Sequence, residues 1–141
     1  MRLIKHIVVV ALVLGLSGIP AMAEVVVVVS TKSPLTTLNK NQLVNIFLGK
    51  AASPDGTPVA PIDQVEGSAA RDEFYATFAG KSAAQIKAHW SKIIFTGRGQ
   101  PPREATNSNE TKKLLGNNPN AIGYIDKSAL DGSVKALTIS P

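Results

Sequence analysis

Residues 25–29 are five consecutive valines, and no other stretch of the chain restricts the fold as strongly. β-Branched side chains favour strands, and a strand without polar alternation is buried on both of its faces. Such strands are typical of parallel sheets that helices cover on both sides. We therefore expect residues 25–29 to form a parallel strand inside an α/β domain.

Helix and strand patterns alternate along the remainder of the chain. Capping boxes are expected where Asn39 precedes Gln42 and where Ser82 precedes Gln85. The Gly- and Pro-containing stretch 96–108 is expected to be a loop. Helices are expected at 39–49, 68–80, 82 to about 94 and 107–116, a helical turn at 126–130, and strands at 59–62, 121–125 and 134–139. This alternation predicts an α/β fold class with a mostly parallel sheet flanked by helices.

The spacing of apolar side chains predicts which helix faces are buried. Residues three and four positions apart share one face of a helix, and each expected helix has such a stripe. The stripes are Leu43, Ile46 and Phe47; then Ala70, Phe74 and Phe78; then Ile86, Trp90, Ile93 and Ile94.

The first 23 residues have the three regions of a secretory signal peptide. Arg2 and Lys5 supply a basic start, residues 7–16 are apolar, and residues 21–23 read Ala-Met-Ala, a small-residue cleavage pattern. The apolar run is too short to span a membrane. We expect residues 1–23 to be a signal peptide cleaved after Ala23, and residues 24–141 to form a single domain in the periplasm. The chain has no cysteine, so we expect stability without disulfides and no lipoprotein membrane anchor.

Charge and composition argue against several classes of function. The formal net charge of +5 becomes +3 once Arg2 and Lys5 are left out, and no dense basic and aromatic patch of a nucleic-acid-binding protein is present. His89 is the only histidine outside the expected signal peptide, so no zinc site can be assembled. It is expected on the polar surface of its helix, and no G-x-S-x-G sequence supplies a hydrolase serine. We expect no enzyme, metal, cofactor or nucleic-acid partner.

The segment Gly67-Ser68-Ala69-Ala70-Arg71 begins a helix in an unusual way. If Ser68 is the N-cap, Arg71 occupies the third helical position, where the helix dipole favours an acid. Gly67 permits close approach of the backbone, Ser68 offers a hydroxyl, and the first amides of the helix would be free to bind an anion. Arg71 could add a two-donor contact to an oxyanion.

Two other interpretations of the same segment remain open. An ordinary capped helix is the commoner explanation, because Glu66, Asp72 and Glu73 surround the segment and would repel an anion. Alternatively, the stem of Arg71 packs under Tyr75 and its guanidinium pairs with an acid. The three interpretations differ in whether removal of Arg71 changes anion binding or stability.

Several motifs resemble the phosphate-binding proteins of ABC transporters. Residues 38–50, LNKNQLVNIFLGK, match the L-x-x-x-x-L-x-x-I-F-L-G-K of those proteins, and NNPNAIGYID at 117–126 is similar to their P-G-A-I-G-Y-V. The Gly67-Ser68 helix start and the single Trp90 lie between these two motifs, in the same order as in those proteins. Asn120 replaces the first glycine of P-G-A-I-G-Y, and asparagine also tolerates a left-handed backbone. The resemblance implies one lobe of a periplasmic-binding-protein-like fold, whereas full members clamp their ligand between two lobes.

The resemblance also implies a set of ligand-binding residues. The turn of those proteins reads R-S-D-G-S-G-T, which places Gly67 and Ser68 on its Gly-Ser and Gln64 where the ligand arginine stands. Ala69 and Ala70 replace its Gly-Thr, and Arg71 is the candidate to supply the missing charge. The implied ligand-binding residues are Gln64, Gly67, Ser68, Ala69 and Arg71.

Two functions follow as hypotheses. The first is a non-enzymatic periplasmic binding module for phosphate or a similar oxyanion, with weak affinity. The second is an interaction or structural module whose former inter-lobe face binds a partner protein or a second copy and no longer binds phosphate.

Overall fold

A computed structural model describes residues 24–50 and 56–141, so the expected signal peptide lies outside the described residues. The central sheet has the strand order β4-β3-β5-β1-β6. Its strands are β1 (Val25–Ser30), β3 (Ala60–Gln64), β4 (Arg103–Ala105), β5 (Ala121–Asp126) and β6 (Val134–Ala136). Strands β4, β3, β5 and β6 point the same way and β1 opposes them, so the expectation of a mostly parallel sheet is confirmed.

The valine strand β1 was expected to be parallel to its neighbours, and this expectation was wrong. It is antiparallel to both neighbours, with Val25 opposite Asp126 and Val29 opposite Ile122. The burial on both faces was predicted correctly, because Val27 and Val29 lie in one hydrophobic core and Val28 in the other. A continuous apolar run reports burial on two faces, and this burial is the same for either strand direction.

The expected strand at 134–139 is divided between two sheets. Leu137 separates β6 from β7 (Thr138–Ser140), and β7 pairs in parallel with β2 (Thr37–Asn39) in a small second sheet. The Leu137 amide donates to the carbonyl oxygen of Val27 at 2.9 Å, which ends the pairing with β1. The apolar pattern indicated an extended chain but not the point at which it leaves the first sheet.

The helices begin at the expected N-caps. They are α1 (Lys40–Phe47), α2 (Ala69–Phe74) continued by the π-helix η1 (Tyr75–Ala79), α3 (Ala83–Phe95), α4 (Ser108–Gly116) and the 3₁₀ turn η2 (Lys127–Ala129). Asn39 and Ser82 form the expected capping boxes, and Ser68 and Asn107 also cap their helices. Gly80 ends η1 in the left-handed conformation, with φ of 61°. Within the described residues, no helix is both long enough and apolar enough to cross a membrane.

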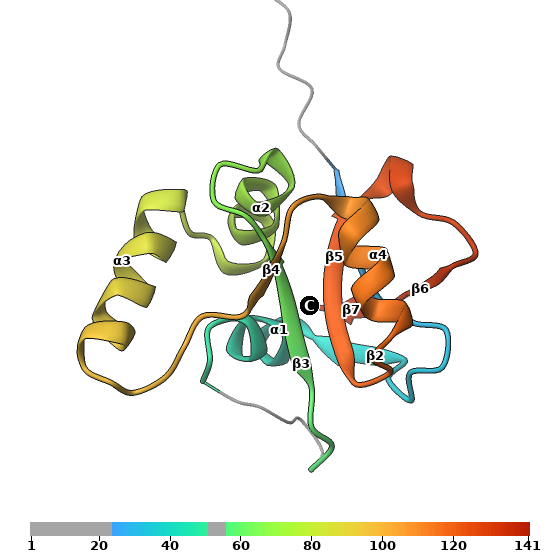
Figure 1. The fold of residues 1–141 in the computed structure, drawn as a ribbon, viewed down its shortest axis with the longest axis horizontal. Coiled ribbons are helices and arrows are strands. Elements are labelled where there is room, and N and C mark those ends of the chain that lie inside the picture. Colours follow the sequence, from blue (N-terminus) through green and yellow to red (C-terminus); the bar gives the residue numbers. More distant parts are fainter. Residues whose placement is uncertain (1–23, 51–55) are drawn as a thin grey trace, which may run out of the picture.

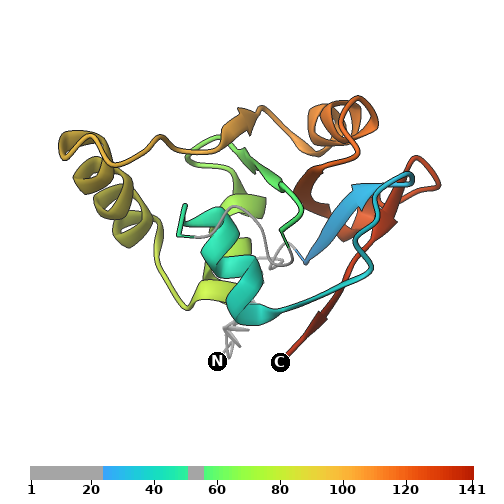
Figure 2. The ribbon, with the colours of Figure 1, turned by 90° about the horizontal axis from the view of Figure 1, so that it is seen from below.

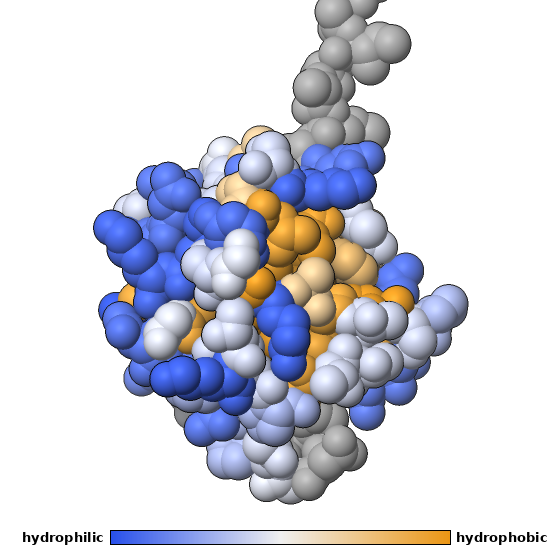
Figure 3. Space-filling view, turned by 90° about the vertical axis from the view of Figure 1, so that its right-hand side faces the viewer, coloured by the Kyte–Doolittle hydropathy of each residue, from blue (hydrophilic) through white to orange (hydrophobic). Residues whose placement is uncertain are grey.

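The helices lie on both sides of the central sheet. Figures 1 and 2 show α3 at one end of the molecule and α4 on the other side of the sheet, with α1 and α2 between α3 and the sheet. The larger core lies on the α1 and α2 side and contains Phe47, Phe74 and Tyr124. On the other side α4 packs closely on β5, since a Cβ at Gly123 would lie 2.8 Å from Cγ2 of Thr111. Figure 3 shows an area of apolar surface on the side that carries α4 and β6.

Two further expectations were wrong. The stretch 96–108 is not entirely loop, because β4 pairs in parallel with β3 through residues 103–105. Its polar sequence hid this strand, which is short and lies at the edge of the sheet. Ile94 is not buried with Ile86 and Trp90 but is 56% exposed, because α3 extends past the core at its C-terminal end.

Candidate anion-binding site

Three neighbouring parallel strands end at one open cavity of about 480 Å³. Gln64 and Asp126 are the last residues of β3 and β5, and Thr106 follows β4 directly. Carboxyl ends of parallel strands meet at one sheet edge, which is the usual ligand position in α/β folds. The cavity is lined by Gln64, Val65, Glu66, Gly67, Ser68, Ala69, Ala70, Thr106, Asn107, Ser108 and Asp126.

Four of the five residues chosen from sequence line this cavity. They are Gln64, Gly67, Ser68 and Ala69, and the fifth, Arg71, is not among the lining residues. The sequence does not indicate that the start of α4 and Asp126 belong to this cavity, because the polar stretch 96–108 hides β4 and the strand ends converge only in the tertiary structure. The only usable signal was the rule that polar side chains gather where parallel strands end.

The start of α2 offers fewer free amides than expected. Ser68 Oγ accepts the N–H of Arg71 at 3.3 Å, as an N-cap should, but the Ser68 amide itself donates to the carbonyl oxygen of Val65 at 3.1 Å. Within the described parts of the chain, the amides of Ala69 and Ala70 donate to no acceptor. Two N–H groups therefore remain for a ligand at this helix start.

Gln64 connects the two helix starts. Its Nε2 donates to the carbonyl oxygen of Tyr124 at 3.2 Å and to Ser108 Oγ at 3.4 Å, while its Oε1 accepts from Ser68 Oγ at 3.0 Å. Ser108 Oγ in turn donates to Asp126 Oδ2 at 3.2 Å. The Gln64 side chain is 2% exposed, so it holds the two serines in place beneath the cavity.

Arg71 turns away from the cavity into the protein. It is 9% exposed, and its Nη1 donates to the carbonyl oxygen of Gln64 at 3.0 Å and to Glu104 Oε1 at 3.3 Å. The same nitrogen lies 3.7 Å from Asp63 Oδ2, and the guanidinium is 5.7 Å from the centroid of the Tyr75 ring. This is the third interpretation of the sequence, in which Arg71 packs with Tyr75 and pairs with acids.

Asp63 is the centre of this buried group. It is 1% exposed and its carboxylate accepts a hydrogen bond from Tyr75 OH at 2.5 Å. It also accepts hydrogen bonds from Tyr124 OH and from the backbone N–H of Gln64. Burial alone would lower the pKa of Arg71, but Asp63, with smaller contributions from Tyr75, Tyr124 and Glu104, more than offsets this and raises it. The guanidinium therefore stays charged and bound to Asp63 rather than available to a ligand. The sequence signal for Asp63 was a single acid inside the strand APIDQ.

The two tyrosines give a test of this buried group. Burial first, and then the Asp63 carboxylate, raise the pKa values of Tyr75 and Tyr124 far above their usual value of about 10. The unfolded chain releases these protons near pH 10 whereas the folded chain retains them. Stability is therefore present below pH 10 and is lost as pH rises above it, by about 1.4 kcal/mol per pH unit for each tyrosine.

We expect the free energy of unfolding to fall by about 2–3 kcal/mol between pH 9 and pH 11. Because Tyr75 and Tyr124 are the only tyrosines in the chain, the folded protein should show almost no tyrosinate absorbance at pH 11. Urea unfolding and ultraviolet titration measure the two quantities. Tyr124→Phe should roughly halve this loss of unfolding free energy between pH 9 and pH 11, because one of the two tyrosines is removed. Tyrosinate absorbance that appears near pH 10 while the protein is still folded would contradict the expectation.

Solved structures of phosphate-transport binding proteins are similar to this arrangement of strands and helices. An ABC-type phosphate transport receptor from Vibrio cholerae matches 82% of this chain with a TM-score of 0.64 and 21% identity. A protein described as a phosphate ABC transporter substrate-binding protein, from Clostridium perfringens with bound phosphate, matches 82% with a TM-score of 0.63 and 23% identity. The chain has the fold of one part of these phosphate-transport binding proteins.

The chain spans less than half the length of these phosphate-transport binding proteins. It covers 45% of the Vibrio cholerae receptor, 44% of the Clostridium perfringens protein and 47% of PstS from Borrelia burgdorferi, the last with a TM-score of 0.60 and 14% identity. No protein-family model and no curated protein matches the sequence. The coverage agrees with the expectation of one lobe from a two-lobed fold.

Proposed function

We propose that this protein is an exported, non-enzymatic binding module for phosphate or a similar small oxyanion. One observation carries the proposal: Gln64, Gly67, Ser68 and Ala69 line one cavity together with Asn107 and Ser108 at the start of α4. Helix starts present unpaired N–H groups and the positive end of the helix dipole, and both favour an anion. The similarity to phosphate-transport binding proteins supports the same class of ligand.

The lining of the cavity favours an oxyanion that carries a hydrogen. Glu66 and Asp126 line the cavity, and no lysine or arginine of the described residues does so. An ionised carboxylate only accepts hydrogen bonds, so it repels a bare sulfate. Phosphate at neutral pH keeps at least one hydrogen, which it can donate to Asp126. We therefore expect phosphate to bind more tightly than sulfate.

The cavity has hydrogen-bond donors for a ligand but lacks the serine–histidine pair of a hydrolase. Ser68 Oγ bonds to Gln64 and Ser108 Oγ bonds to Asp126, so neither serine has a histidine as base. His89 lies on α3 with its Nε2 2.9 Å from the carbonyl oxygen of Leu48. This half-buried contact, rather than the free surface position expected from sequence, gives His89 a role in joining α3 to the end of α1.

The affinity for phosphate should be weak. The cavity is open and Arg71 is bound to acids, so we expect a bound anion to remain partly hydrated. Two or three hydrogen bonds to a charged group contribute about 1.5–3 kcal/mol each. After the cost of immobilising the ligand, we expect a Kd of roughly 0.1–10 mM. Calorimetric titration with phosphate and sulfate measures it, and nanomolar binding by a monomer would contradict the expectation.

A matched pair of cap variants separates binding from folding. Ser68 and Ser82 are both N-cap serines whose Oγ accepts the N–H three residues on, at 3.3 and 3.2 Å, but only Ser68 lines the cavity. Ser68→Ala and Ser82→Ala should each cost about 1 kcal/mol of stability. Only Ser68→Ala should weaken phosphate binding, by about tenfold. Equal affinities in the two variants would remove Ser68 from the site.

The second function, a module that binds a partner protein or itself, has one observation in its favour. The arginine that the resemblance expects is replaced by the neutral, buried Gln64, and the nearby Arg71 is already paired. On this hypothesis, phosphate produces no heat even at concentrations well above 10 mM, and light scattering detects self-association or a bound partner. Millimolar saturable heat from phosphate supports the first function instead.

A further inference from the structure

Helix α3 has a second stripe of uncharged side chains, which faces away from the core. Ile86 is buried, and Phe95 follows it by nine residues, which is two and a half turns of helix, so Phe95 points to the opposite side. Phe95 is 92% exposed. Ala84, Ala88 and Ser91 lie about three, two and one turns before Phe95 and are also exposed. We call these four residues the outer stripe of α3.

Basic side chains border the outer stripe. Lys87 and Lys92 lie on either side of it, because they are eight and three residues before Phe95. From residue 81 to residue 103 the chain has five basic residues and no acid. The five are Lys81, Lys87, Lys92, Arg98 and Arg103. The segment that contains α3 therefore carries a formal charge of +5, whereas residues 24–141 together have 13 basic and 10 acidic residues, a charge of +3.

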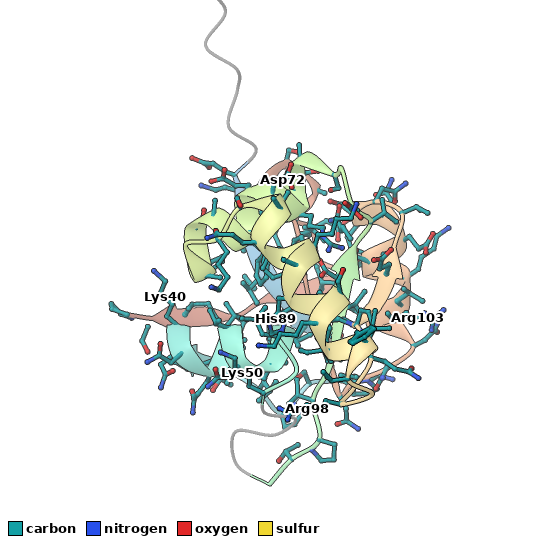
Figure 4. All side chains as sticks on the ribbon, turned by 90° about the vertical axis from the view of Figure 1, so that its left-hand side faces the viewer. Lys40, Lys50, Asp72, His89, Arg98 and Arg103 are labelled. Atoms are coloured by element: carbon teal, nitrogen blue, oxygen red, sulfur yellow. The ribbon has the colours of Figure 1, made fainter. Side chains whose placement is uncertain are left out.

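Few acids neutralise this positive face. Lys87 forms an ion pair with Glu66 at 3.5 Å, but both side chains are more than half exposed, so the pair is weak. In the described ranges 24–50 and 56–141, no carboxylate forms a salt bridge with Lys92, Arg98 or Arg103. Figure 4 shows this side with α3 in front, Arg98 and Arg103 near one end and Asp72 beyond the other.

We propose that the outer stripe of α3 and its flanking bases bind the surface of an anionic lipid bilayer. Amphipathic helices that lie at a membrane surface place an aromatic or aliphatic side among lipid chains and lysines beside the headgroups. The exposed Ile94 precedes Phe95 at the same end of the helix, about 100° around it, and adds apolar surface beside the stripe. Lys87 and Lys92 extend their apolar stems along the surface while their charges reach the headgroups.

The size of the stripe favours a bilayer over an acidic protein partner. A stable protein interface takes about 20–30 residues on each side. The outer stripe has four residues, of which Ala84, Ala88 and Ser91 offer little side chain to pack against. A bilayer needs no minimum area and no fixed pairing of charges, and it attracts a polybasic face through its surface potential. The oxyanion cavity contains no residue of α3, and Lys87 reaches its lining only through the exposed ion pair with Glu66.

Vesicle sedimentation tests this proposal. The chain beginning at Glu24 contains every described helix and strand, so it is used after circular dichroism has shown that it is folded. It is mixed with vesicles of phosphatidylcholine alone or of phosphatidylcholine and phosphatidylglycerol. We expect binding only to the vesicles that contain phosphatidylglycerol, and a steady loss of binding as salt is added. No binding to these vesicles would overturn the proposal.

Variants locate the contact on α3. Lys87→Gln with Lys92→Gln should weaken vesicle binding by about fivefold for each lysine, and Phe95→Ser by about tenfold. The matched control is Lys32→Gln with Lys113→Gln, which removes the same charge from exposed positions outside α3. This control should bind nearly as well as the unmodified chain. An equal loss in both double variants, or unchanged binding by Phe95→Ser, would overturn the proposal.

Discussion

Replacing Asp63 by alanine is expected to lower the free energy of unfolding by about 3–5 kcal/mol. The reason is that Asp63 is 1% exposed and neutralises Arg71, which is itself only 9% exposed. Without the carboxylate, Arg71 keeps a buried charge with the half-exposed Glu104 as its remaining ion-pair partner, and the hydroxyls of Tyr75 and Tyr124 lose their acceptor. Domains of this size have a total stability of about 5–15 kcal/mol, so much of it would be lost.

Arg71→Ala should be destabilising for the same reason, because it leaves the Asp63 carboxylate buried and unpaired. Urea unfolding with a constant dependence on denaturant measures both variants. Glu24→Ala is the control: its ion pair with Lys127 spans 3.4 Å, but both side chains are at least 70% exposed, so little change is expected. If Arg71→Ala were as stable as the unmodified chain, the buried ion pair would not contribute to folding. Arg71 would then either bind an anion or be an ordinary residue of a capped helix, the first two interpretations of the sequence.

Replacing Phe74 by alanine should lower the free energy of unfolding by about 3–5 kcal/mol. Phe74 is 1% exposed and stands at the centre of the aromatic core. Its ring centroid lies 4.1 Å from that of Tyr124 in a stacked pair, 4.7 Å from that of Phe47 and 5.1 Å from that of Tyr75. The cavity left by alanine would remove contacts with all three rings at once.

Phe95→Ala is the matched control for this core variant. The same side chain is removed at a position that is 92% exposed, so almost no stability should be lost. Thermal or urea unfolding of the two variants compares them directly. A loss at Phe74 below about 1 kcal/mol would mean that the core can close around the missing ring, contrary to the packing described above.

Much of this fold was predictable from short segments. Asn39, Ser68, Ser82 and Asn107 cap their helices as expected, because an N-cap acts on an amide only three residues away. The burial of residues 25–29 on two faces followed from side-chain type alone. Gly67, Ser68 and Ala69 were placed at a cavity from a helix-start motif and a resemblance, although binding at that cavity stays a prediction.

The direction of β1 and the role of Arg71 were decided by tertiary structure. Either strand direction would bury the valines equally, and only the position between β5 and β6 makes β1 antiparallel. The first turn of α2 is compatible with an arginine that faces a ligand, yet Arg71 instead contacts Glu104, 33 residues away. Asp63 likewise accepts a hydrogen bond from Tyr124, 61 residues away. Caps and apolar stripes depend on residues within about one turn of helix, so a short segment is enough to predict them. Strand direction and buried ion pairs join distant segments, and which of the possible partners is used depends on how the whole core packs.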